Sequence, residues 1–80
     1  MKEKIEIISN NIRSYRIRAG LKQYEVANIL GVSRTTYNDY EVNPKKLKIE
    51  TLEKMDTIFN CKIADFFIVS NVTESNNTIW

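Results

Sequence analysis

Apolar residues recur every three or four positions through much of the chain, with charged and polar residues between them. The first such stretch has apolar side chains at Ile5, Ile8, Ile12, Tyr15 and Ala19. Residues with this spacing share one face of a helix, so the pattern predicts an amphipathic α-helix. Glycine adopts the left-handed cap conformation at little cost, so the helix is expected to end at the glycine of position 20.

Two shorter helices are predicted next, with a tight turn between them. The second helix spans about 23–30 and stops at Gly31. The third spans about 33–41 and begins with a serine, which is a favourable N-cap residue. Its tyrosines, Tyr37 and Tyr40, are three positions apart and therefore share a face, which we expect to point inward.

Two further helices complete the expected fold. Asn43-Pro44 is a turn signal. A fourth helix follows from about Ile49, and Asn60 can cap it in the left-handed conformation. A short fifth helix is predicted over 63–67. The predicted fold class is therefore all-α, with five helices.

The length of the chain, 80 residues, allows one small domain. We assign residues 1–67 to it and residues 68–80 to a polar C-terminal tail. The chain has one cysteine and no histidine, so neither an internal disulfide nor a Cys-rich zinc site can form, and the commonest general base is missing. We expect no enzyme activity, no metal and no cofactor. No apolar run approaches the roughly 20 residues that cross a bilayer, and no signal sequence is apparent, so a soluble, cytoplasmic protein with no membrane partner is expected.

Charge is distributed unevenly along the chain. Residues 1–48 contain ten Lys and Arg against five Asp and Glu, a balance of +5, whereas residues 49–80 contain two against five, a balance of −3. Such asymmetry is a mild indication of a polyanionic partner on one side of the molecule.

The segment from Gln23 to Tyr40 has the spacing of a helix-turn-helix. Two helices that cross steeply through a short turn must approach closely. Ala27 is small where they would touch, and Gly31 supplies the turn conformation. Apolar residues stand where the pair would pack on the rest of the domain, namely Val26, Leu30, Val32, Tyr37 and Tyr40.

Residues 8–67 resemble the phage Cro and repressor type (XRE-like) of helix-turn-helix domain. The matching residues are Arg16, Gly20, Leu21, Gln23, Val26, Ala27, Leu30, Gly31, Val32, Ser33, Tyr40, Glu41, Leu52, Met55 and Phe59. The resemblance implies a DNA-binding transcriptional regulator, most often a repressor, whose third helix lies in the major groove of double-stranded DNA. It also implies a structural ion pair between Arg16 and Glu41.

The outward face of the third helix has side chains suited to base edges. With the tyrosines inward, it carries Arg34, Thr35 and Asn38, with Asp39 at its edge. Arginine can fork onto guanine, asparagine can pair with adenine, and the threonine methyl can contact thymine. The resemblance adds Ser33 to this base-reading set.

Phosphate contacts are expected around this face. The resemblance places Gln23 at a phosphate, and Lys22 lies beside it. The lysines of the loop before the fourth helix, Lys45, Lys46 and Lys48, can touch phosphates without reading sequence. Thr36 and the hydroxyl of Tyr37 complete the expected set.

The C-terminal segment is rich in large apolar residues for a solvated tail. We expect a homodimer or partner surface there, formed by Ile63, Phe66, Phe67, Ile68, Val69 and Trp80. A palindromic operator would then be read by two copies. The alternative is a protein-binding antirepressor or antitoxin-like regulator with the same fold, which would use this tail to hold a protein partner.

Overall fold

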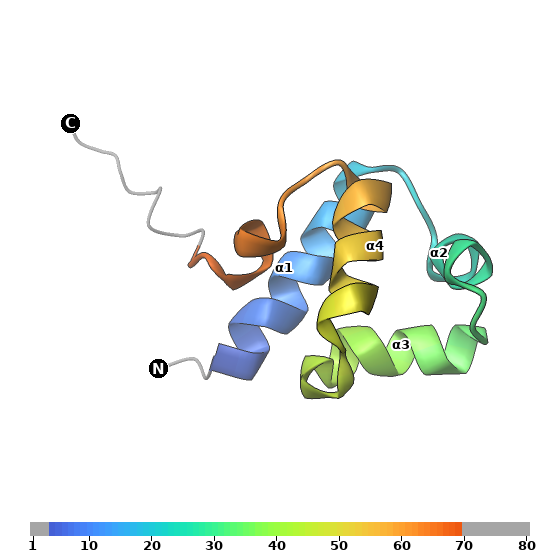
Figure 1. The fold of residues 1–80 in the computed structure, drawn as a ribbon, viewed down its shortest axis with the longest axis horizontal. Helices are drawn as coiled ribbons and strands as arrows, with labels where there is room; N and C mark the ends of the chain where they lie inside the picture. The colour runs from blue at the N-terminus through green and yellow to red at the C-terminus, as the bar shows by residue number, and fades with distance from the viewer. Residues whose placement is uncertain (1–3, 70–80) are drawn as a thin grey trace.

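The computed structural model describes residues 4–69, which form four α-helices and two 3₁₀ helices, with no strand among these residues. In chain order they are α1 (Lys4–Arg18), α2 (Gln23–Leu30), α3 (Arg34–Val42), η1 (Pro44–Lys46), α4 (Ile49–Phe59) and η2 (Ile63–Phe67). In Figure 1, α2 and η2 lie on opposite sides of the central helices α1 and α4, and α3 runs along the lower edge. The predicted all-α class is confirmed.

The count of five α-helices is not confirmed. The predicted fifth helix begins and ends as expected, but Ile63–Phe67 is a 3₁₀ helix. A segment of five residues can close few α-helical hydrogen bonds, so the tighter 3₁₀ turn competes well. Its start is stabilised by the carboxylate of Asp65, which accepts a hydrogen bond from the backbone N–H of Lys62 at 3.0 Å.

The turn between α2 and α3 is built by local chemistry that the sequence makes visible. Gly31 has φ 75°, a left-handed conformation that favours glycine. The N–H of Val32 donates to the carbonyl of Ala27 at 3.0 Å, which closes the end of α2. The hydroxyl of Ser33 accepts a hydrogen bond from the N–H of Thr36 at 3.0 Å, which caps the start of α3. These contacts end α2 and begin α3 within a short turn.

All four α-helices and η2 contribute buried side chains to a single hydrophobic core. Its buried apolar residues are Ile12, Val26, Ala27, Tyr37, Leu52, Met55, Phe59 and Phe66. Tyr40 is half-buried and packs against this cluster, with its ring 6.2 Å from that of Tyr37. The face that both tyrosines share therefore points inward, as the three-residue spacing predicts.

Phe66 belongs to this core and is not available to a partner. It is fully buried, and its ring packs edge-on against Tyr15 at 6.1 Å and Phe59 at 6.3 Å between centroids. The side chain of Asn11 holds the segment down by donating to the carbonyls of Phe66 at 2.9 Å and Ile68 at 2.7 Å.

The other residues of the expected partner surface divide into three groups. Ile63 is half-buried against the core. Phe67, Ile68 and Val69 are exposed. Trp80, with most of the tail, lies outside the described residues.

Replacing Phe66 tests whether η2 is part of the folding unit. Phe66→Ala should lower the free energy of unfolding by about 3–5 kcal/mol, because it leaves a cavity between Tyr15 and Phe59. Phe67→Ala is the matched control and should change it by less than about 1 kcal/mol in dilute protein, because this neighbouring ring is exposed. Urea unfolding measures both. Equal effects would contradict the assignment of Phe66 to the core.

Candidate nucleic-acid interface

The second helix of the helix-turn-helix presents one anchored face and one free face. The side chain of Tyr37 is fully buried, whereas Arg34 at the first residue of α3, Thr35 and Asn38 are exposed. Because α2 and α3 pack directly on each other, the free face is held at a fixed orientation. A rigid helix with an outward row of hydrogen-bonding side chains is the form that enters the major groove of DNA.

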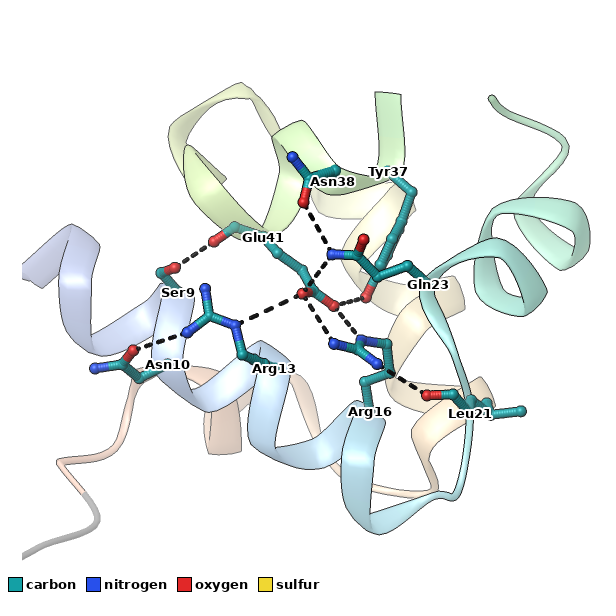
Figure 2. A network of polar contacts seen from close by, with 9 residues as sticks. All are labelled: Ser9, Asn10, Arg13, Arg16, Leu21, Gln23, Tyr37, Asn38 and Glu41. Atoms are coloured by element: carbon teal, nitrogen blue, oxygen red, sulfur yellow. Dashed lines mark hydrogen bonds and ion pairs between the residues drawn. The ribbon is translucent and has the colours of Figure 1, made fainter. Parts of the chain in front are cut away.

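A buried carboxylate lies where α1, α2 and α3 meet (Figure 2). Glu41 is fully buried, and Nε of Arg16 lies 2.5 Å from its Oε2. The hydroxyl of Tyr37 donates to the same oxygen at 2.6 Å, and Nε2 of Gln23 donates to Oε1 at 3.1 Å. Burial of a charge is costly unless partners compensate it, and here two neutral donors and one cation do so.

The protonation of this cluster follows from its contacts. Burial raises the pKa of Glu41, but hydrogen bonds from Arg16, Tyr37 and Gln23 and the charge of Arg16 outweigh it and hold the pKa below its usual value. Burial, the hydrogen bond to Glu41 and the charge of Glu41 raise the pKa of Tyr37 well above its usual value. The carboxylate is therefore charged and the phenol neutral at neutral pH.

The sequence predicts the hydroxyl of Tyr37 at a DNA phosphate, and the structure corrects this. Its hydroxyl lies inside the domain and donates to Glu41, so it is not presented to a ligand. A buried tyrosine needs a partner for its hydroxyl, and the carboxylate one turn further along α3 supplies it.

Ser9 and Arg13 of α1 also contact Glu41, and the sequence carries a signal for both. Ser9 donates its hydroxyl to the backbone carbonyl of Glu41, and Nε of Arg13 lies 3.9 Å from Oε1. On α1, Ser9 lies four residues before Arg13, and Arg13 lies three residues before Arg16, so the three side chains share one face of the helix. That spacing could have identified them once Arg16 was assigned to an ion pair.

A hydrogen bond joins the expected phosphate residue of α2 to a base-reading residue of α3. Nε2 of Gln23 donates to Oδ1 of Asn38 at 3.0 Å, in addition to its bond to Glu41. Gln23 is half-buried at the first residue of α2, while Asn38 is exposed. The polar cluster therefore extends from the buried carboxylate to the outer surface.

The remaining expected residues lie around the free face of α3. Asp39 forms an ion pair with Lys46, in which Nζ lies 2.9 Å from Oδ2, and both side chains are about half exposed. An exposed pair of this kind contributes about 0–1 kcal/mol, so it can exchange for a phosphate contact. Ser33 donates its hydroxyl to that of Thr36 at 2.9 Å. Lys22, Lys45 and Lys48 are exposed.

The acidic residues, the cysteine and the helix lengths within residues 4–69 bear on other kinds of site. No group of three His, Cys, Asp or Glu side chains there is placed to hold a metal ion. Burial, with the charges of Asp65 and Asp56, raises the pKa of Cys61 to about 11, which makes its thiol a poor nucleophile. Within the same described range, none of the helices has the length and hydrophobicity that a membrane crossing requires.

The chain belongs to the helix-turn-helix family, whose sequence pattern matches residues 12–66. It is similar to the cryptic phage CTXphi transcriptional repressor RstR of Vibrio cholerae, with 39% identity over 59 residues. The matched stretch covers 74% of this chain and 53% of that protein, so the chain spans about half the length of the curated relative it matches. No solved structure matches the chain.

Removing the cation of the cluster should be strongly destabilising. Arg16→Met leaves the charge of Glu41 buried without its main partner, and we expect a loss of about 3–5 kcal/mol in the free energy of unfolding. Arg13→Met is the matched control on the same helix, because its guanidinium is more distant and half exposed, and it should cost less than about 1 kcal/mol. Urea unfolding distinguishes them, and similar losses would contradict the assignment of Arg16.

The same cluster predicts how stability depends on pH. Glu41 has a lowered pKa in the folded chain, so its contribution is present above the ordinary value of 4.5 and is lost as pH falls below it. Tyr37 has a raised pKa, so its contribution is present below the ordinary value of 10.0 and is lost as pH rises above it. Urea unfolding from acid to alkaline pH checks both limits. Tyr37→Phe should flatten the alkaline limb, whereas Tyr24→Phe, at an exposed tyrosine, should leave it unchanged.

Proposed function

We propose that this chain is a sequence-specific DNA-binding transcriptional repressor that acts in the cytoplasm and reads double-stranded DNA with α3. One observation carries the proposal: α3 has a free face of hydrogen-bonding side chains, while its opposite face is fixed by Tyr37 and Glu41. Membership of the helix-turn-helix family supports it, because the second helix of that motif lies in the major groove. Similarity to a phage transcriptional repressor supports repression.

Base reading is assigned first to Arg34, Thr35 and Asn38, whose side chains are exposed. Arg34 can donate twice to guanine, and the methyl group of Thr35 can contact the methyl group of thymine. Ser33 and Asp39 are assigned a smaller part in base reading, because each side chain already has a partner within the domain. The hydroxyl of Ser33 caps α3, and the carboxylate of Asp39 pairs with Lys46.

Phosphate binding is assigned to the margins of this face. The side chains proposed are Lys22, Thr36, Lys45, Lys46 and Lys48, all of which are exposed. Gln23 donates through its side chain to Asn38 and Glu41, so we assign its phosphate contact to the backbone N–H at the first turn of α2. Such contacts position the protein without reading sequence.

We also propose that two copies bind together. Phe67, Ile68 and Val69 form a run of exposed apolar residues at the end of the described chain, and burial of such a run favours association. A two-fold dimer would place two copies of α3 about 34 Å apart, one helical turn of DNA. The operator should then be palindromic. A protein partner for the tail is the competing use of this surface.

Selection of bound duplexes from a random pool tests the function. At about 0.15 M salt, where nonspecific binding is weak, the chain should recover a palindrome with half-sites one turn apart. Recovery of no sequence above background would overturn the proposed function.

Two substitutions then separate reading from positioning on the selected operator. Arg34→Ala should cost about 1–3 kcal/mol on the operator and relax one base position. Lys45→Ala should weaken operator and random DNA alike and reduce the salt slope of log K by about one. Fluorescence anisotropy at several salt concentrations measures both. An equal loss on both DNAs for Arg34→Ala would contradict its base-reading role.

A further inference from the structure

The hydrogen bonds around Glu41 determine the orientation of two side-chain amides, those of Gln23 and Asn38. Glu41 is a charged carboxylate, so its oxygens can only accept hydrogen bonds. Gln23 lies 3.1 Å from Oε1 of Glu41 and must therefore turn its NH₂ group, not its carbonyl, toward the carboxylate. The orientation of the Gln23 amide follows from the chemistry of its buried partner.

The second amide is fixed by the first. Nε2 of Gln23 has two hydrogens, and the one not used by Glu41 is directed at Asn38, 3.0 Å away. Asn38 must meet a donor with its own oxygen, Oδ1. Its Nδ2 group then points away from Gln23, as Figure 2 shows, and the Asn38 side chain is exposed.

The polarity of Asn38 matters because base edges differ in what they offer. In the major groove, adenine and guanine present N7 as an acceptor, guanine adds O6, and thymine presents O4. Cytosine presents only the N4 donor there. A donor held toward the groove can bond with the first three bases and meets another donor at cytosine.

We infer that Glu41 and Gln23 are positioning residues that hold Asn38 as a hydrogen-bond donor toward the DNA, so that the base read by Asn38 must present an acceptor and cytosine is rejected. This inference rests on the proposed function, because it requires α3 to lie in the major groove. It assigns a specificity role to two residues that need not touch a base. Without Gln23, the Asn38 amide is free to rotate by half a turn and to accept from cytosine.

The test uses the full chain and the operator recovered by selection. Asn38→Ala first identifies the base position, because only that position should lose its preference. At that position, cytosine should weaken binding of the unmodified chain roughly tenfold or more. Gln23→Met retains the length of the side chain but removes both donors, and it should reduce this penalty to about threefold or less while other positions keep theirs. Lys22→Met is the matched control at the neighbouring exposed residue: as a proposed phosphate contact it should weaken binding to all sequences alike, so the cytosine penalty should stay unchanged.

Three results would overturn the inference while leaving the proposed function intact. They are a recovered operator at which Asn38→Ala alters no base preference, a cytosine preference at the Asn38 position, and an unchanged cytosine penalty in Gln23→Met. A wild-type chain that selects no operator would overturn the proposed function and the base-reading step with it.

Nuclear magnetic resonance of the DNA-free chain tests the polarity independently. The side-chain NH₂ protons of Gln23 should exchange slowly with solvent, because both are hydrogen-bonded. Those of Asn38 should exchange rapidly. The reverse pattern would overturn the inference whatever DNA the chain binds.

Discussion

The carboxylate of Glu41 is removed from water at the point where three helices meet, and every helix there must supply something to keep it charged. A buried ion without partners would cost several kcal/mol, which is comparable with the whole stability of a small domain. The guanidinium of Arg16 comes from α1, the amide of Gln23 from α2 and the hydroxyl of Tyr37 from α3 itself. The charge of Glu41 is therefore compensated only when α1, α2 and α3 are correctly packed. A displacement of any of these helices would leave the carboxylate under-compensated.

The hydrogen bonds that stabilise the buried Glu41 carboxylate also orient a side chain at the surface. The donors that satisfy Glu41 include Gln23, whose second hydrogen reaches Asn38 at the surface. Two hydrogen bonds, both donated by Gln23, consequently link the buried Glu41 to the exposed Asn38. The free face of α3 is held in place without a ligand, which would reduce the ordering that the proposed DNA binding requires.

The sequence predicts the helices well where their ends depend on local chemistry. α2 and α4 begin where expected, and Gly31, Ser33 and Asn60 mark ends because their backbone or side-chain properties act within a few residues. It predicts less where distant contacts decide. Phe66 lies in a segment too short to show a helical period, and only its packing on Tyr15 and Phe59 makes it core.

The candidate site shows the same division between local and distant information. The outward residues of α3 follow from the inward tyrosines, but the bond between Gln23 and Asn38 joins residues fifteen positions apart. Its existence depends on the crossing angle of two helices, which no spacing rule specifies to hydrogen-bond accuracy. The burial of the Tyr37 hydroxyl is similar, because the sequence pattern places the ring inside but does not show which group its oxygen meets.

The two bonds from Asn11 to the carbonyls of Phe66 and Ile68 tie the last described turn to α1, and α1 is tied to α3 through Glu41. The apolar run from Phe67 to Val69 is thus mounted on the same rigid body as α3. If two copies were joined through that run, the distance and angle between their α3 helices would be fixed. One base pair inserted between half-sites would rotate one of them by roughly a tenth of a turn, and the DNA, not the protein, would have to twist to restore the fit.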